Sequence, residues 1–335
     1  MAKDITRDKF FAEMEKELKR FVDTRTGLLD NKYSVYIDCP LCRKNNFKKL
    51  FDKSGFTYVR CSECTFVFVN PRLNEDSILE GYSESNHAES NRIWKEVLET
   101  NQQQSFNTQA YSFLLKELKK LGKVSGKLLD VGCSIGHFMS LAKQFGFEAE
   151  GVELEPQARA AAIKKGFIVK DHLIENSSYE DKSFDVISLL GLIEHLPNPL
   201  DFMQHIRRIL KDDGFILFNG VPNINSINNI MLGSKARVFN GRNHLGYYTK
   251  RTFLKLMSDS GFEVVFFDTY VTALDSIINT IQGLDPFDDV SYDLLDVKIK
   301  SLLKENRSIV EKFILDNELG YKIRAIVQKS SIPKC

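Results

Sequence analysis

The 335-residue sequence predicts an α/β fold: a largely parallel sheet covered by helices, preceded by a small metal-binding module. Three observations support this prediction. Strand-like and helical patterns alternate from Lys127 onward, an apolar run turns through two glycines into a helix between Leu128 and Phe138, and four cysteines form two Cys-x-x-Cys pairs. Alternation of this kind favours parallel strands with helices on both faces of the sheet.

The bulk composition is that of a soluble globular protein, with 43% hydrophobic and 27% charged residues. The formal net charge of +1 gives no reason to expect a nucleic-acid partner. No stretch approaches the roughly 20 apolar residues that span a bilayer, and the first twenty residues are charged throughout with no signal-peptide core. We therefore expect a cytoplasmic protein, in which the six cysteines are thiols or metal ligands rather than disulfides.

The chain opens with an amphipathic helical pattern from Ile5 to Val22. Its polar face mixes both charges, which favours a helix that docks on its own chain over one that lies on a membrane surface.

The two cysteine pairs follow this helix. Cys39 and Cys42 are separated by eighteen residues from Cys61 and Cys64. Two such pairs can place four thiolates at the corners of a tetrahedron, which suits Zn²⁺ and closes its coordination shell, so the predicted metal role is structural. The segments Phe56–Arg60 and Thr65–Asn70 look like short strands of a zinc ribbon, and the lysines around them are interpreted as a solvated face.

Helical patterns near Asp76–Gly81 and over Ser90–Leu121 connect the ribbon to the sheet. From there the predicted strands are Lys127–Val131, Phe147–Val152, Phe167–Val169, Phe184–Leu190, Phe215–Asn219, Phe262–Val271 and Tyr321–Gln328, and the predicted helices are Phe138–Phe145, Pro156–Lys165, Pro199–Leu210 and Lys250–Ser260. A helical insertion at 272–319 separates the last two strands and is either a lid, a dimer surface or a packing helix pair.

The glycine turn predicts a nucleotide ligand, because glycine lets main-chain N–H groups approach it closely. Ser134 stands where a dinucleotide fingerprint would have its second glycine, which favours S-adenosylmethionine over a dinucleotide. The carboxylate of Asp130, at the end of the strand, can pair with the positively charged amino-acid end of that ligand. Glu153, about twenty residues after the turn, can accept the ribose hydroxyls.

These segments, with Ser183–Ile187 and Glu194–Pro199, resemble the class I S-adenosylmethionine-dependent methyltransferases, in particular the subgroup similar to ubiquinone-biosynthesis O-methyltransferases. The resemblance spans about 127–260. The ribbon followed by Phe66–Arg72 is similar to the N-terminal module of zinc-containing methyltransferases that modify sugars and cell-surface glycans. The resemblance implies a Rossmann-like seven-stranded mixed sheet in which Tyr321–Gln328 is the antiparallel strand.

The resemblance also implies a cofactor site. Asp130, Gly132 and Gly136 would hold the methionine end, and Glu153 the ribose. Relatives usually place an acidic residue against adenine where this chain has Leu173, so Asp171 or main-chain groups would substitute. We expect the side chain of Cys133 to be packed. The predicted cofactor-contacting residues are Asp130, Gly132, Cys133, Gly136, Glu153, Leu154, Asp171 and Leu190.

Two histidines are candidate general bases, since a neutral imidazole titrates near the working pH. His195 follows the fourth strand and His244 lies in a polar, aromatic loop; each could instead have a structural role. Some similar quinol methyltransferases bind a divalent ion with a glutamate three residues before the Glu-His pair. That position is Gly191 here, which argues against a catalytic metal. The predicted acceptor contacts are Glu194, Asn219, Arg242 and Tyr247.

The predicted function is methyl transfer from S-adenosylmethionine to a small-molecule or glycan acceptor, with a sugar hydroxyl in saccharide or nucleotide-sugar metabolism as the leading interpretation. The alternatives are an rRNA or tRNA base methyltransferase, a sugar C-methyltransferase and a noncatalytic partner protein. The insertion makes a homodimer an open expectation. The predicted segments are 1–35 (N-terminal helix), 36–72 (zinc ribbon), 73–126 (helical connector), 127–271 (methyltransferase domain), 272–319 (insertion) and 320–335 (final strand and tail).

Overall fold

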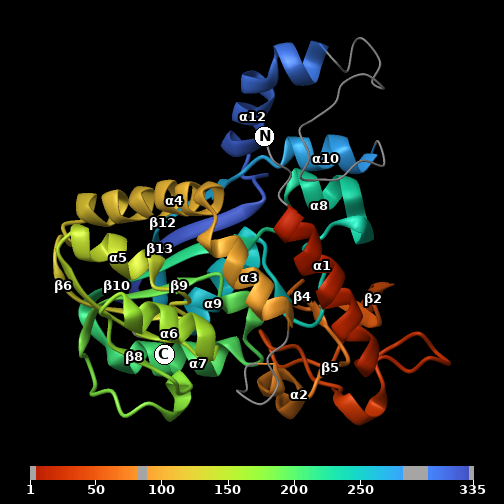
Figure 1. Cartoon of the computed structure of the whole chain (residues 1–335), viewed down its shortest axis with the longest axis horizontal. Coiled ribbons are helices and arrows are strands. Elements are labelled where there is room, and N and C mark those ends of the chain that lie inside the picture. Colours follow the sequence, from red (N-terminus) through yellow and green to blue (C-terminus); the bar gives the residue numbers. More distant parts are fainter. Residues whose placement is uncertain (1–4, 82–88, 282–300, 332–335) are drawn as a thin grey trace.

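The central feature of the computed structural model, which describes residues 5–81, 89–281 and 301–331, is a seven-stranded sheet (Figure 1). Its strand order is β12-β13-β10-β9-β6-β7-β8. β13 is antiparallel to both of its neighbours, β10 and β12, while β10, β9, β6, β7 and β8 pair in parallel. The predicted seven-stranded mixed sheet with a reversed last strand is therefore confirmed. The strands are β6 (Gly126–Val131), β7 (Phe147–Val152), β8 (Val169–Lys170), β9 (Phe184–Leu190), β10 (Leu210–Pro222), β12 (Phe262–Tyr270) and β13 (Lys322–Lys329).

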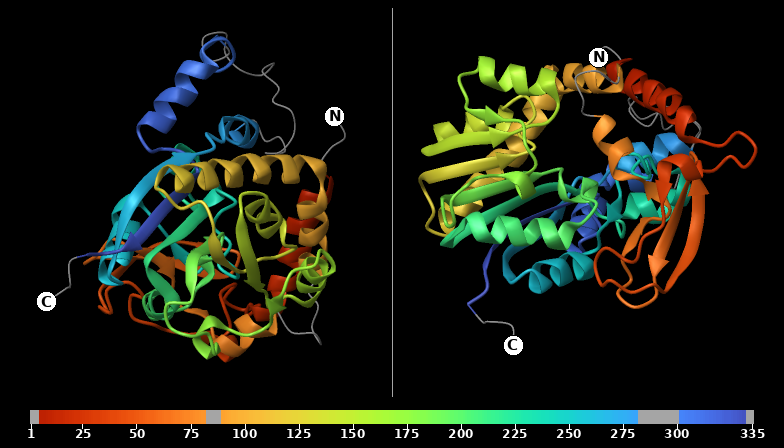
Figure 2. Two further views of the ribbon diagram at one scale, coloured as in Figure 1. Left: turned by 90° about the vertical axis from the view of Figure 1, so that its left-hand side faces the viewer. Right: turned by 90° about the horizontal axis from the view of Figure 1, so that it is seen from below.

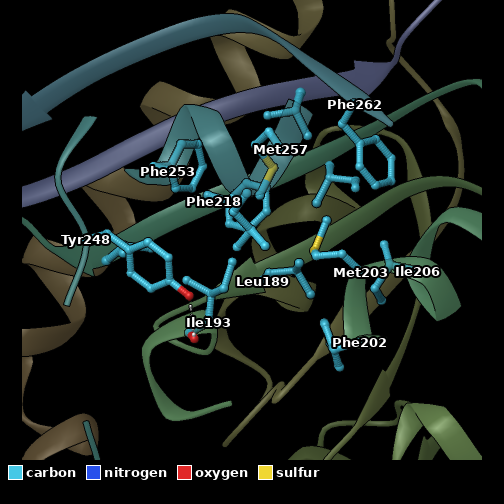
Figure 3. Packing of buried hydrophobic residues seen from close by; sticks show 14 of the residues in the cluster. Leu189, Ile193, Phe202, Met203, Ile206, Phe218, Tyr248, Phe253, Met257 and Phe262 are labelled. Atoms are coloured by element: carbon cyan, nitrogen blue, oxygen red, sulfur yellow. Dashed lines mark hydrogen bonds between the residues drawn. The ribbon is translucent and has the colours of Figure 1, made fainter. Parts of the chain in front are cut away.

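Helices cover both faces of this sheet. On one face α4 (Asn101–Lys120) and α5 (His137–Gln144) pack through Leu114, Leu118 and Phe138 against inward-facing strand residues. On the other face α7 (Pro199–Ile209) and α9 (Lys250–Asp259) pack against Phe218 and Leu189 (Figure 3). α6 (Pro156–Lys164) lies between β7 and β8 in the chain. Alternate strand residues thus point to opposite layers, as the pleat of a buried strand requires.

The N-terminal module is joined to the sheet domain by a shared strand. β2 (Phe47–Lys53), β3 (Phe56–Cys61) and β4 (Val67–Val69) form an antiparallel sheet, and β11 (Gly246–Tyr247), which follows β10 by more than twenty residues, pairs with β4. Phe66 and Phe68 share one hydrophobic cluster with strands of the large sheet. The module and the sheet domain therefore pack side by side as one folded body (Figure 2).

The helices before the large sheet differ in one respect from the prediction. The expected helix over Ser90–Leu121 is two helices, α3 (Glu89–Glu99) and α4, because Thr100 caps the second one: its hydroxyl accepts the Gln103 N–H at 3.3 Å. The N-terminal helix α1 (Ile5–Leu18) docks on its own chain, since Phe10 and Met14 pack against Ile93 of α3.

Shorter elements complete the chain. They are η1 (Lys19–Phe21), η2 (Asn31–Tyr33), β1 (Ser34–Val35), β5 (Arg72–Leu73), α2 (Glu75–Glu80), η4 (Ile174–Asn176), η5 (Ile193–His195), α8 (Ile227–Leu232) and η6 (Gly233–Lys235). The described part of the predicted insertion contains α10 (Leu274–Ile281), the π-helical turn η7 (Ser301–Glu305) and α12 (Arg307–Asp316), and its remainder, 282–300, lies outside the described residues. Within the described ranges, we find no helix with the length and apolarity that a bilayer crossing demands.

Candidate functional site

The candidate site lies at the carboxyl ends of β6, β7, β9 and β10, where the order of the strands reverses between β6 and β9. Ligands of open α/β sheets bind at this position. After β6 the chain turns through Gly132 and Gly136, whose φ angles of 75° and 74° belong to the left-handed region that glycine adopts without strain. The N–H groups of Gly132 and Cys133 donate to the Val152 carbonyl at 2.8 and 3.0 Å, which ties the turn to the end of β7.

Asp130 is buried at the end of β6, with 2% of its surface exposed. Ser188 of β9 donates its hydroxyl to the Asp130 carboxylate at 2.6 Å. Burial raises the pKa of Asp130 to about 7, and the Ser188 hydrogen bond opposes this shift. A positively charged group bound beside this carboxylate would favour its ionised form, so Asp130 is suited to a ligand that carries an ammonium.

Glu153 closes the other side of the turn. Its carboxylate accepts the Ser134 and Glu155 N–H groups, both at 2.8 Å. Burial raises the pKa of Glu153 and the backbone hydrogen bonds counteract it. A carboxylate offers about four acceptor positions, and two backbone donors leave capacity for ribose hydroxyls.

The other predicted cofactor residues differ in their burial and in their contacts. The Cys133 side chain is packed with Met139 and Ala162, as we expected, so only its backbone faces the turn. Leu154 presents its carbonyl to Arg159 at 3.1 Å, and Leu190 packs at the edge of the α4 layer. The Asp171 carboxylate is 70% exposed and lies 3.6 Å from Arg159. The contact of Asp171 with adenine stays a prediction.

The two predicted base candidates come together. The rings of His195 and His244 are in edge-to-face contact, with centroids 5.0 Å apart, and one ligand atom from each of these residues and from Glu194 lies within 4.8 Å of the others. The sequence does not reveal this proximity, because the two histidines lie in distant segments. His195 ends η5, which follows β9, whereas His244 precedes β11 by two residues. The same three side chains could bind a divalent cation or act on a proton.

The electrostatics of this cluster favour neutral imidazoles. Burial lowers the pKa of His195 to about 3, assisted by His244, and lowers the pKa of His244 to about 4. The Val238 carbonyl lies 2.9 Å from Nδ1 of His244, which fits the tautomer with the proton on Nδ1 and leaves Nε2 as an acceptor. Burial also raises the pKa of Glu194 to about 7.

Several polar atoms at this edge are buried without a hydrogen-bond partner among the described residues. They are Oε2 of Glu194, Nδ1 of His195, Oδ1 of Asn219 and the hydroxyl of Tyr270. Buried polar groups are nearly always hydrogen-bonded in native proteins, so a group of them at the expected ligand position indicates that a ligand or water completes them.

Arg242 and Tyr247, predicted as acceptor contacts, have other partners. Arg242 forms an ion pair with Glu17 of α1, with their side chains 10% and 16% exposed, and Ser90 donates to the same carboxylate at 2.7 Å. Tyr247 is fully buried in the cluster between the ribbon and the sheet domain. In this structure they hold the His244 loop in place, and their contact with the acceptor stays a prediction.

Sequence reasoning missed Ser188 and Tyr270. Ser188 and Tyr270 lie inside strand-like runs and carry no local signal of a site.

The four predicted metal ligands also come together. Sγ of Cys39 lies 3.5 Å from Sγ of Cys64, the same distance separates Cys42 from Cys61, and one atom from each lies within 4.8 Å of the others. Tetrahedral zinc with Zn–S bonds of about 2.3 Å places sulfur atoms about 3.8 Å apart, so the cluster fits this ion.

Comparisons with known proteins agree with the fold. Residues 102–266 match the family model described as a methyltransferase domain. Ubiquinone biosynthesis O-methyltransferase of Actinobacillus pleuropneumoniae serotype 7 is 27% identical over 114 residues, covering 31% of this chain and 49% of that protein. The protein of the same name from Idiomarina loihiensis is 31% identical over 105 residues, covering 29% and 43%.

One solved structure supports the fold alone. It is that of magnesium protoporphyrin IX methyltransferase from Synechocystis PCC 6803 with bound SAH. The match has a TM-score of 0.50 and 12% identity, and it covers 77% of this chain and 100% of that chain. The fold, the carboxyl-edge site and the family match define a class I S-adenosylmethionine-dependent methyltransferase domain. Within this class, the curated relatives named above are O-methyltransferases, and this chain spans about half of their length or less.

Proposed function

We propose that this protein transfers a methyl group from S-adenosylmethionine to a hydroxyl of a small-molecule or glycan acceptor, with a sugar hydroxyl as the leading class. One observation carries the proposal: the cluster of the buried Glu194 and the half-buried His195 and His244 lies at the same sheet edge as the Asp130 and Glu153 carboxylates. The names of the O-methyltransferase relatives support oxygen as the acceptor atom.

S-adenosylmethionine supplies an activated methyl group and its own leaving group. The chain must therefore position the acceptor and receive a proton from its hydroxyl. A neutral histidine with one nitrogen held by a backbone carbonyl, as in His244, presents the other nitrogen as a proton acceptor. Glu194, when ionised, would stabilise the imidazolium formed on His195, since Oε1 of Glu194 lies 3.9 Å from Nε2 of His195.

We also propose that Cys39, Cys42, Cys61 and Cys64 hold a structural Zn²⁺. All four ligand positions are taken by protein thiolates, so the ion would stabilise the module without a coordination position for chemistry. β11 couples this module to the loop that carries His244.

The proposal is tested by methyl transfer from radiolabelled S-adenosylmethionine to a panel of free sugars, nucleotide sugars, catechols and bulk RNA. Label in a sugar hydroxyl supports it. Label in catechol oxygen would retain O-methylation but replace the acceptor class, and label in RNA or in sugar carbon would overturn it.

A further inference from the structure

The N-terminal module holds the half of the site that carries Glu194, His195 and His244. Leu245, the residue after His244, donates its N–H to the Glu194 carbonyl at 2.8 Å. The carbonyl of Leu245 accepts the N–H of Val69, the last residue of β4, at 3.1 Å. Backbone hydrogen bonds of one residue therefore link the module, the His244 loop and the η5 turn, and they join the two segments that carry the histidines.

Arg72 adds a side-chain contact between the same parts of the molecule. It begins β5, at the end of the module, and its Nη1 donates at 2.6 Å to the carbonyl of Pro197, two residues after His195. The Nε atom of Arg72 is buried and has no hydrogen-bond partner among the described residues. Burying a guanidinium in this way costs free energy that one carbonyl contact offsets only in part. The contact with the chain after η5 is therefore the main contribution that we assign to Arg72.

Aromatic packing lies behind these hydrogen bonds. The ring centroid of Phe66, just before β4, lies 5.0 Å from that of Tyr248. The hydroxyl of Tyr248 donates to the Ile193 carbonyl of η5 at 3.4 Å (Figure 3). These residues share one hydrophobic cluster with three of the paired cysteines, Cys39, Cys61 and Cys64. The η5 turn and the N-terminal module thus belong to one packed core.

The cofactor half of the site is held by other contacts. The Asp130 carboxylate accepts the hydroxyl of Ser188 from the neighbouring strand. The Glu153 carboxylate accepts the N–H groups of Ser134 and Glu155. All of these partners belong to the sheet domain. A small change in the N-terminal module should therefore disturb the histidines and spare the cofactor site.

We infer that Arg72 is a positioning residue for methyl transfer: together with the backbone contacts of Leu245, it lets the N-terminal module fix His195 relative to His244. The inference rests on the proposed function, in which these histidines serve proton transfer from the acceptor. A misplacement of about 1 Å can slow catalysis by about 100-fold, so a side chain outside the pocket can be as important as one inside it. The module is then part of the acceptor site, in addition to its proposed role in holding zinc.

The test uses the full-length protein with ¹⁵N-labelled histidine and S-adenosylhomocysteine, so it needs no identified acceptor. The imidazole resonances are assigned with His195→Gln and His244→Gln. They are then compared in Arg72→Met, which removes the donor, and in Arg72→Lys, which retains one. We expect the His195 resonances to shift in Arg72→Met and to return toward their natural positions in Arg72→Lys, with an unchanged calorimetric affinity for S-adenosylhomocysteine. For any compound of the acceptor panel that takes the label, kcat should fall roughly 10- to 100-fold in Arg72→Met.

Arg43→Met is the matched control. Arg43 also links the module to the sheet domain, through an ion pair of 2.8 Å with Asp201, but this contact lies on α7 and its two side chains are 53% and 60% exposed. The histidine resonances should stay unchanged in this variant. Arg72→Gln, whose shorter side chain loses the contact with Pro197, provides the same comparison if Arg72→Met does not fold.

The inference is overturned if the folded Arg72 variants leave the His195 resonances at their natural positions, or if Arg43→Met shifts them equally. A loss of S-adenosylhomocysteine binding in Arg72→Met alone would also contradict it, because the cofactor half should be spared. Absence of S-adenosylhomocysteine binding in the natural protein would instead remove the proposed function, while the histidine spectra would still report whether Arg72 positions the η5 turn.

Discussion

Loss of the proposed zinc ion should destabilise much more than the ribbon. Replacing Cys64 with Ser removes one of four thiolates whose sulfur atoms already converge. Structural zinc in small modules contributes roughly 10–16 kcal/mol, as much as the roughly 5–15 kcal/mol that stabilises a typical domain. Cys39, Cys61 and Phe66 lie in the same hydrophobic cluster as Leu129 of the large sheet, so the loss should spread into the methyltransferase domain.

The assay combines metal analysis with thermal unfolding. The natural protein should contain one zinc per chain, and Cys64→Ser should lose it and unfold at a clearly lower temperature, as should chelator-treated natural protein. Cys133→Ser is the matched control, because it makes the same change outside the cluster and should retain the zinc. A metal-free natural protein, or a Cys64→Ser variant with full zinc content and an unchanged midpoint, would refute the reasoning.

Three further outcomes follow from the site. Burial raises the pKa of Asp130 to about 7, so its ionised fraction falls from about 90% at pH 8 to about 10% at pH 6. The affinity for S-adenosylmethionine, measured by calorimetry, should therefore fall up to about tenfold over this range. Asp130→Asn should abolish this pH dependence. Glu17→Gln leaves the buried Arg242 guanidinium without its charged partner, so denaturant unfolding should show a free energy of unfolding lower by about 3 kcal/mol. Adding Arg242→Met should recover part of this loss. A loss of unfolding free energy below about 0.5 kcal/mol would argue against the ion pair. His244→Gln should lower kcat by roughly 10²- to 10⁴-fold with the cofactor Kd unchanged, and a full kcat would exclude His244 as the base.

The sequence was informative where the chemistry is local. The cysteine spacing, the Gly132 turn and the carboxylate of Glu153 each lie within one short segment, and the structure brings each of these local groups together. The alternating pattern likewise predicted the seven strands, with boundary differences of a few residues at β8 and β10.

What the sequence could not reveal depends on contacts between distant segments. Glu17 and Arg242 are 225 positions apart, and nothing in either segment signals an ion pair. β11 is two residues long, too short for a periodic pattern, and is defined only by its pairing with β4. The break at Thr100 was missed, although the polar run from Glu99 to Ser105 interrupts the apolar spacing there.

The most direct test of the central claim is titration of the purified protein with S-adenosylhomocysteine, followed by S-adenosylmethionine. The structure predicts one molecule bound per chain, with weaker binding in Glu153→Gln because that carboxylate is placed for the ribose. Neither heat release nor a thermal shift with either compound would contradict the assignment of this sheet edge as the cofactor site.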